Sequence, residues 1–395
     1  MGPLLLALAP VIFQAEPPAR DSGALQALEG RLDQAPVPHW QRRLPGVPIS
    51  AFTHTERSRP VSDGDSLFLG SASSSELLQM SRTTGEVLAV YPAGAPVQSE
   101  AILLPDGKVL FADTGGYTWC YEVGSDEPLW SHFGGAPIGS APTVQGAQVF
   151  VSNVDDVVYA LSVHDGSLSW RYARPADPTR SSELTLYGAP GPAVAGRLLL
   201  AGFSDGAVVA LDIEDGEVNW ERRVGEGRYP DVIATPLVDE GDVFVGGYSE
   251  PLVSFDAATR NVRWRLDVGS AAPPLLVGDI LYHGATDGKL RRIDRATGGV
   301  VWTWESGTTG ALTQPQLTDA GLLVASSDGS LYLLEPETGV ELWRYDPGYV
   351  LTGITVAPLV IGRQLVAVTN AGRVLSMLSP QGISPTMPPL GAGRL

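Results

Sequence analysis

The sequence predicts an all-β fold, an eight-bladed β-propeller whose blades are four-stranded antiparallel sheets. Three observations predict it: turn-forming residues are abundant, the apolar fraction supports a core, and one short pattern recurs along nearly the whole chain. The 395 residues include 46 glycines and 32 prolines, which favours many short strands joined by tight turns. Apolar residues make up 44% of the chain, so a disordered chain is excluded.

The recurring pattern is clearest between Ala210 and Trp220. It consists of a small residue, an aspartate two positions later, a glycine four positions after that, and a tryptophan four positions further on. Its last position recurs at intervals of 38 to 50 residues, at Ala89, Trp130, Trp170, Trp220, Trp264, Trp302, Trp343 and Thr386. The glycine position holds Gly85, Gly166, Gly216, Gly298, Gly339 and Gly382. Eight copies at this spacing predict eight repeated structural units.

Each copy predicts four short strands. An apolar strand (234–238 in one copy) is followed by an alternating strand (243–245), and a turn that is often Asp-Gly leads to the third. Asp-Gly, as at Asp205-Gly206, supplies the positive φ values of a tight hairpin. The fourth strand carries the tryptophan, whose indole is expected to fill the wedge between neighbouring blades. These tryptophans are therefore interpreted as structural residues.

The two ends of the chain are expected to meet in the last blade. The eighth copy predicts strands near 354–360, 364–368 and 373–378, but no tryptophan strand follows them. Near the N-terminus, the segment around Trp40 looks like a fourth strand without a blade. The sequence therefore predicts that the N-terminal Trp40 strand completes the last blade and closes the ring, which removes its open edge.

The sequence outside the repeats is divided into three segments. Residues 1–15 contain a ten-residue apolar run, Leu4 to Phe13, which predicts an export signal; an ordinary apolar N-terminus is the alternative. Residues 16–35 are predicted to be a linker with a short helix around Ala24 to Leu32. The propeller is assigned to residues 36–386, and residues 387–395 are expected to be a flexible tail.

The charge balance excludes one large class of partners. Forty-four acidic residues against 26 basic ones give a net charge of −18, whereas nucleic-acid binding depends on clustered lysines and arginines. No apolar run is long enough for a transmembrane helix. A single cysteine, Cys120, has no partner for an internal disulfide, and its place in the small-residue position predicts a buried, inert thiol.

No residue pattern predicts catalysis, a cofactor or a metal site. The five histidines occupy unlike repeat positions without metal-ligand spacing. The segment 202–206 matches G-x-S-x-G, but it lies between two predicted strands, so it is interpreted as a hairpin and not as a nucleophile elbow. The acidic turns at 63–65 and 239–242 are expected to be solvated and not to bind calcium.

The eleven-residue pattern resembles the tryptophan-docking motif of the pyrroloquinoline quinone (PQQ) propeller repeat superfamily, and this resemblance covers nearly all of residues 36–386. Within it, the chain is most similar to the BamB family, whose members act in outer-membrane β-barrel assembly. An extra loop from Arg174 to Pro190 contains Glu183–Gly188, which looks like a Leu-x-Leu-Arg-Gly loop of that family. The segment 229–236 looks like its Asp-x-Asp-Thr-Thr-Pro segment.

This resemblance implies partner-binding residues. Leu184, Leu186 and Asp231 match the family pattern, while Tyr187 stands at its arginine and Ile233 at its second aspartate. Two leucines on an exposed loop are typical of a contact surface; leucines folded back over the blade rim are the alternative interpretation. The predicted partner-binding residues are Leu184, Leu186, Tyr187 and Asp231.

The resemblance also implies a function. We expect a non-catalytic scaffold without a cofactor, monomeric within a complex, that binds protein partners such as the periplasmic domains of the barrel-inserting subunit. We expect it in the periplasm or cell envelope, associated with the outer membrane, with the cytoplasm as the alternative. No cysteine follows the apolar run, although members of this family are usually lipoproteins. The alternatives are a PQQ-dependent oxidoreductase, which needs a calcium site and a catalytic aspartate, or an interaction propeller with an unrelated partner.

Overall fold

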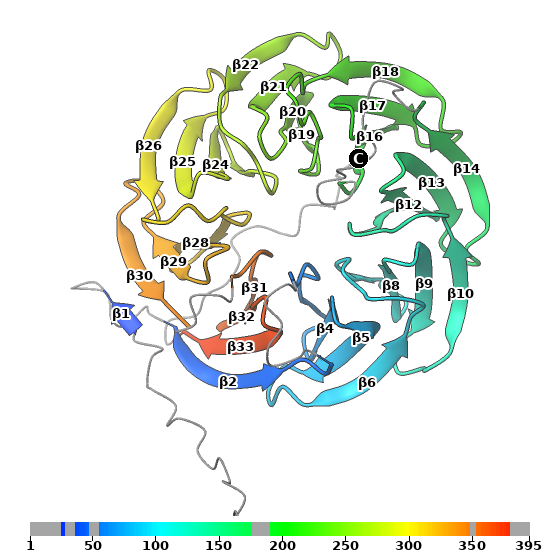
Figure 1. Cartoon of the computed structure of the whole chain (residues 1–395), viewed down its shortest axis with the longest axis horizontal. Coiled ribbons are helices and arrows are strands. Elements are labelled where there is room, and N and C mark those ends of the chain that lie inside the picture. Colours follow the sequence, from blue (N-terminus) through cyan, green and yellow to red (C-terminus); the bar gives the residue numbers. More distant parts are fainter. Residues whose placement is uncertain (1–24, 28–35, 47–54, 176–189, 348–352, 380–395) are drawn as a thin grey trace, which may run out of the picture.

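Eight antiparallel blades of four strands each stand around a common centre, and one of these sheets has a fifth strand added to it (Figure 1). The computed structural model describes residues 25–27, 36–46, 55–175, 190–347 and 353–379, and these contain strands and turns but no helix. Within each blade the four strands follow one another in order from the centre of the ring to its rim. The first strand lies nearest the centre and the fourth lies at the rim (Figure 1). The predicted all-β, eight-bladed propeller is therefore confirmed.

The first four blades are formed by consecutive strands. Blade 1 contains β3 (Val61–Ser62), β4 (Ser66–Ser71), β5 (Ser74–Ser81) and β6 (Val87–Pro92). Blade 2 contains β7 (Ile102–Leu103), β8 (Lys108–Ala112), β9 (Tyr117–Glu122) and β10 (Pro128–Phe133). Blade 3 contains β11 (Thr143–Gln145), β12 (Gln148–Asn153), β13 (Val157–Ser162) and β14 (Leu168–Ala173). Blade 4 contains β15 (Ala193–Ala195), β16 (Leu198–Gly202), β17 (Ala207–Asp212) and β18 (Val218–Arg223).

The remaining blades follow the same order, with additions from the N-terminus. Blade 5 contains β19 (Leu237–Asp239), β20 (Asp242–Val245), β21 (Leu252–Asp256) and β22 (Val262–Leu266). Blade 6 contains β23 (Leu275–Val277), β24 (Ile280–Gly284), β25 (Lys289–Asp294) and β26 (Val300–Glu305). Blade 7 contains β27 (Gln316–Thr318), β28 (Gly321–Ala325), β29 (Leu331–Leu334), β30 (Glu341–Tyr345) and the added β1 (Leu25–Ala27). Blade 8 contains β31 (Leu359–Ile361), β32 (Gln364–Val368), β33 (Arg373–Leu378) and β2 (Val37–Arg43).

A glycine and an indole meet at most junctions between blades. At five junctions, the turn before the fourth strand places a glycine at φ near +70° against the tryptophan of the preceding blade. A methyl group on these glycines would lie 2.5–2.8 Å from an indole carbon, which leaves no room for any other residue. The pairs are Trp40 with Gly85, Trp130 with Gly166, Trp170 with Gly216, Trp264 with Gly298, and Trp302 with Gly339.

The indole N–H also finds an acceptor in the neighbouring blade. Trp170 Nε1 donates to the carbonyl of Ile213 at 2.9 Å, and Trp264 Nε1 donates to that of Arg295 at 2.8 Å. Trp130 donates to the carbonyl of Val163 at 3.1 Å in the same way. A buried indole that keeps its hydrogen bond adds apolar contact without leaving its N–H unsatisfied. The repeated pattern therefore joins one blade to the next.

Tyrosines replace this contact between blades 1 and 2, where Ala89 stands in the tryptophan position. Tyr91 is fully buried, and its hydroxyl accepts a hydrogen bond from the Gly124 N–H at 3.0 Å. Tyr121 of β9 donates to the carbonyl of Pro92 at 2.5 Å. The two rings meet edge to face, with centroids 5.5 Å apart. This junction keeps an aromatic wedge, but the sequence pattern did not predict which residues form it.

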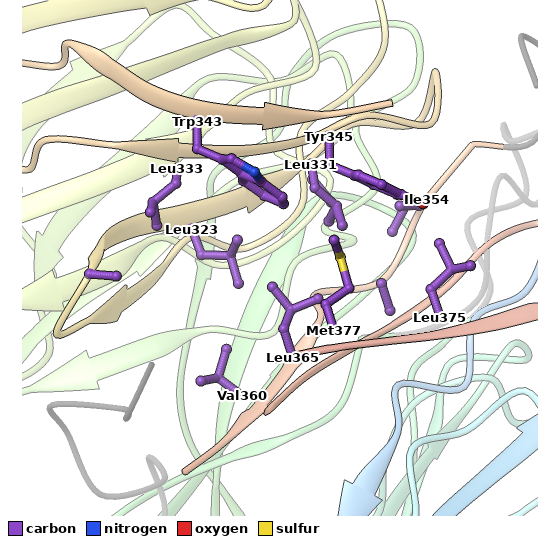
Figure 2. Packing of buried hydrophobic residues seen from close by; sticks show 13 residues of the cluster. Leu323, Leu331, Leu333, Trp343, Tyr345, Ile354, Val360, Leu365, Leu375 and Met377 are labelled. Carbon is purple, nitrogen blue, oxygen red and sulfur yellow. The ribbon is translucent and has the colours of Figure 1, made fainter. Parts of the chain in front are cut away.

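The chain ends meet in blade 8. The Trp40 strand, β2, pairs antiparallel with β33, and Trp40 lies opposite Ser376. Figure 2 shows the apolar side chains between blades 7 and 8, where Trp343 and Tyr345 of β30 face Leu375 and Met377 of β33. The pairing of β2 is as expected; that this strand is what holds the ring closed stays a prediction.

Two local expectations differ from the structure. Leu25–Ala27 form strand β1 on the edge of β30 and not part of a short helix, because an unpaired sheet edge offers backbone partners to an extended segment. The first strands of the blades are shorter than predicted: β31 begins at Leu359, whereas the apolar run begins at Ile354. The Ile354 N–H instead donates to the carbonyl of Ser326 in blade 7.

Candidate functional site

The candidate site lies at one end of blades 3 to 5. In an antiparallel blade, the connections from strand 2 to strand 3 and from the fourth strand to the next blade lie at the same end, here called the loop end. The connections from strand 1 to strand 2 and from strand 3 to strand 4 lie at the other end, the turn end. The extra loop between β14 and β15 and the connection between β18 and β19 are both at the loop end.

Three of the four predicted partner-binding residues lie outside the described residues. Leu184, Leu186 and Tyr187 belong to the segment 176–189 of the extra loop, so their role remains a prediction. The two ends of this loop are described. They show how it is attached to the ring.

Arg174 anchors the first end of the extra loop. Its Nη2 lies 2.7 Å from Oδ2 of Asp205 in blade 4, and its Nη1 lies 3.1 Å from Oε2 of Glu221. The guanidinium also lies over the ring of Phe203, 5.5 Å from its centroid. Burial by itself would lower the pKa of Arg174, but its hydrogen bond with Asp205 and their charge attraction outweigh burial and raise the pKa. Arg174 therefore stays charged and links blade 3 to blade 4.

The second end of the loop is fixed by backbone contacts. Pro190, Gly191 and Pro192 are buried, and Thr143 of blade 3 donates a 2.6 Å hydrogen bond to the carbonyl of Pro192. The two described ends of the loop are therefore held against blades 3 and 4.

The neighbouring connection, residues 224–236, is hydrogen-bonded to the turn between β16 and β17 of blade 4, the turn that contains Asp205. The Val224 N–H donates to the carbonyl of Gly206 at 2.8 Å, and the Val232 N–H donates to that of Phe203 at 3.2 Å. Glu250 of blade 5 is buried, and its carboxylate accepts hydrogen bonds from the N–H groups of Glu226 and Gly227 at 3.1 and 2.9 Å. This carboxylate holds the tip of the connection in one place.

The exposed tip of this connection differs from the residue that the resemblance implied. The Asp231 side chain is only 7% exposed, whereas Glu226, Gly227 and Arg228 face solvent. The Arg228 guanidinium lies over the Tyr229 ring, 5.5 Å from its centroid. A partner at this surface would meet Arg228 directly, and buried Asp231 would act through the shape of the loop. The charged residues in the glycine-flanked stretch 225–229 were the sequence signal for this tip.

The segment that matches a nucleophile elbow is a β-hairpin. Ser204 lies in the turn between β16 and β17, and no helix follows it. The Ser204 N–H and hydroxyl both donate to the carboxylate of Asp156 in blade 3. Ser204 therefore joins two blades, which agrees with the hairpin interpretation.

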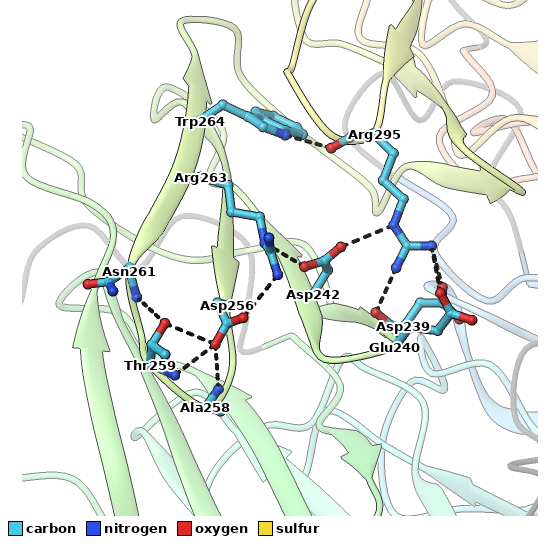
Figure 3. A network of polar contacts seen from close by, with 10 residues as sticks. All are labelled: Asp239, Glu240, Asp242, Asp256, Ala258, Thr259, Asn261, Arg263, Trp264 and Arg295. Carbon is cyan, nitrogen blue, oxygen red and sulfur yellow. Dashed lines mark hydrogen bonds and ion pairs between the residues drawn. The ribbon is translucent and has the colours of Figure 1, made fainter.

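The acidic turn at 239–242 is ion-paired and not simply solvated, as Figure 3 shows. Arg295 of blade 6 reaches across the junction, with its Nη1 2.7 Å from Asp239 Oδ2 and its Nε 3.1 Å from Asp242 Oδ2. Arg263 pairs with the other oxygen of Asp242 at 2.6 Å. The carbonyl of Arg295 is also the acceptor for the Trp264 indole, so this network strengthens a blade junction at the turn end.

Two buried titratable groups, Cys120 and His283, have shifted pKa values. Within the described part of the chain, no group of three or more His, Cys, Asp or Glu side chains is arranged to hold a metal ion. Burial raises the pKa of Cys120 to about 11, which keeps this thiol protonated. Burial lowers the pKa of His283 to about 4, although its ring nitrogen lies 3.3 Å from the carbonyl of Gly269. The same described residues include no helix long and apolar enough to cross a membrane.

The glycine–indole junctions and the eight four-stranded blades together define a propeller of PQQ-like repeats. Over residues 92–304 the chain matches the family described as "Outer membrane protein assembly factor BamB", and it belongs to that family.

Curated relatives agree with this assignment. The chain is 25% identical to the outer membrane protein assembly factor BamB of Salmonella typhimurium over 294 residues, which are 63% of this chain and 75% of the relative. It is 24% identical to BamB of Escherichia coli strain K12 over 274 residues, 59% and 70% of the two chains.

The structural likenesses show a shared fold alone. The BamB structure from Moraxella catarrhalis superposes with a TM-score of 0.72 at 20% identity, covering 87% of this chain and all of that one. The quinohemoprotein alcohol dehydrogenase ADHIIG from Pseudomonas putida HK5 gives a TM-score of 0.70 at 13% identity, covering 91% and 78%.

Proposed function

We propose that this protein is a non-catalytic scaffold of the cell envelope that binds protein partners during outer-membrane β-barrel assembly. Membership of the BamB family supports this role, because the relatives are named as outer membrane protein assembly factors. The proposed location is the periplasm, in association with the outer membrane. The proposed partner is the periplasmic part of the barrel-inserting subunit.

One observation carries the proposed binding site: at the loop end of blades 3 to 5, the described ends of the extra loop and the tip of the next connection are held in place. Arg174 holds the extra loop through Asp205, and Glu250 holds the tip of the next connection. Loops that are held before binding lose less conformational entropy on binding, so a rigid ring suits them as a recognition surface. Leu184, Leu186 and Tyr187 are proposed as contacts on the first loop and Arg228 on the second, with Asp231 shaping the latter.

The test replaces both leucines of the loop, Leu184→Glu with Leu186→Glu, and measures capture of the isolated periplasmic domains of the barrel-inserting subunit. We expect capture to be lost while the melting curve stays that of the wild type, because charged residues would replace apolar contacts. Arg228→Glu should weaken capture as well, because an ion pair between Arg228 and an acidic group of the partner would be replaced by repulsion between like charges.

The matched control makes the same change on the rim. Leu129 and Leu168 on β10 and β14 are each 49% exposed, so Leu129→Glu with Leu168→Glu adds the same charge away from the loops. This control should retain capture. If the loop variant also retains it, the proposed surface is wrong. Affinity capture from envelope extracts with the wild type would then show whether an unrelated protein is the partner.

A further inference from the structure

Blade 7 differs from the other blades because a fifth strand is added to its outer edge. The three residues of β1 pair antiparallel with β30, so that Leu25 lies opposite Tyr345 and Ala27 opposite Trp343. The other sheets end at their fourth strand among the described residues. β1 lies across the ring from β14 and β18, whose loop ends form the candidate site (Figure 1).

An apolar groove adjoins this edge. It has a volume of about 240 Å³ and lies between β2, β30 and β33. Its lining includes the apolar or aromatic residues Trp40, Tyr345, Leu375 and Met377 and the polar residues His39 and Ser376. Tyr345 both lines the groove and pairs with β1, so the groove adjoins the edge of β30.

The junction between blades 7 and 8 is also incomplete. The Trp343 side chain is 1% exposed, yet its indole N–H has no hydrogen-bond acceptor within the described residues. The equivalent indoles of Trp130, Trp170 and Trp264 each donate to a carbonyl of the next blade. A buried donor without an acceptor costs stability, so this junction is bonded less completely than those of Trp130, Trp170 and Trp264.

We propose that the outer edge of β30, with the adjoining groove, is a docking site for an extended polypeptide strand of a partner protein, which displaces β1. The added strand makes antiparallel hydrogen bonds to β30, as β1 does. Its alternate side chains contact the groove, and the others face solvent. The partner is therefore a segment of alternating apolar and polar residues, a pattern found in unfolded strands of β-barrels. This surface is additional to the loop site of the proposed function.

The shortness of β1 makes it displaceable. Three residues provide few hydrogen bonds, fewer than the five or six residues of an average strand provide. β1 holds the edge because it belongs to the same chain, which keeps its local concentration at about the millimolar level. A longer strand from a partner makes more contacts along β30 and can compete with it.

The experiment weakens β1 in the full chain with Leu25→Pro and Ala27→Pro, since proline removes backbone donors and opposes strand pairing. The probe is a labelled peptide of about ten residues that alternates valine and threonine, and its control has the same composition in two blocks. We expect the double-proline variant to bind the alternating peptide at least about tenfold more tightly than the wild type does. The blocked peptide should bind neither protein. The melting curve of the variant reports whether the ring is intact.

Amide hydrogen exchange places the peptide on the ring. Protection of residues 343–345 on peptide binding supports the proposal, and protection confined to other blades overturns it. Equal binding of the peptide by wild type and variant also overturns it. A concentration-dependent dimer of the wild type, with β1 of one copy cross-linked to β30 of another, would show strand exchange between copies instead. Capture through the Leu184 loop is measured separately, so the failure of one proposal does not decide the other.

Discussion

At the residue scale, two separate restrictions favour glycine at position 216. Its backbone has a φ of +75°, which favours glycine, and an added methyl group would lie 2.5 Å from the Trp170 ring. The second restriction depends on a residue of another blade. The sequence predicted the Trp–Gly spacing within each repeat, but the contact joins a glycine to the tryptophan of the preceding repeat.

Gly216→Ala should therefore destabilise the protein more than the same change at a glycine with free space. Gly196 is the matched control, because its φ is +63° and nothing lies within 4 Å of an added methyl group. We expect Gly196→Ala to cost about 1 kcal/mol from the left-handed backbone alone. Gly216→Ala should cost about 2–4 kcal/mol, because overpacking against the indole is added. Denaturant unfolding measures both, and equal losses would contradict the wedge contact.

Two repeats depart from the pattern, one at its glycine position and one at its tryptophan position, and the structure accommodates each departure differently. Arg260 occupies the glycine position of the repeat that ends at Trp264 and adopts a φ of +64°, a conformation that is costly for arginine. Ala89 replaces a tryptophan, and Tyr91 two positions later supplies the aromatic contact. The sequence identified both departures from the repeat. It did not predict their replacements, because these depend on which side chains of two blades meet.

At the element scale, the sequence predicted the bounds of the second and third strands of blade 8 but not those of the first strand. β32 and β33 coincide with the segments 364–368 and 373–378 inferred from the sequence. The first strand of the same blade does not, because Ile354 is buried and bonded to blade 7 before the ladder begins. An apolar residue in a connection between blades looks like a strand residue, since both kinds of position are buried.

Strand β2 gives the clearest prediction at this scale. A chain that begins at residue 36 retains β2 and lacks only β1, whereas a chain that begins at residue 47 lacks both. The shorter chain should lose at least about 3–5 kcal/mol, since Trp40 leaves its site against Gly85 and the edge of β33 is exposed. Denaturant unfolding and light scattering of the two chains measure this. If the shorter chain unfolds at the same denaturant concentration and stays monomeric, β2 does not hold the ring closed.

At the scale of the whole molecule, the ring was predictable and its polar contacts were not. Eight copies of one pattern imply eight blades, whatever lies between them. The ion pair of Arg295 with Asp239 joins residues 56 positions apart, and only the packed ring brings them together. The burial of Asp231 has the same origin, because its backbone carbonyl packs against Gly247 of blade 5. The sequence therefore singled out the two neighbouring connections, whose role as a binding site stays a prediction, but it did not show which residues of the second connection are exposed.

The last prediction separates a scaffold from a quinoprotein. A cofactor that binds the folded ring raises its stability by about 2.7 kcal/mol at a concentration one hundred times its dissociation constant. PQQ with calcium should leave the melting temperature and the quinone absorbance unchanged, because no metal-holding group of side chains occurs in the described residues. An apo-quinoprotein titrated in parallel provides the positive control. A calcium-dependent rise in melting temperature, removed by a chelator, would instead favour the oxidoreductase, and the hub of the ring would then become the site to map.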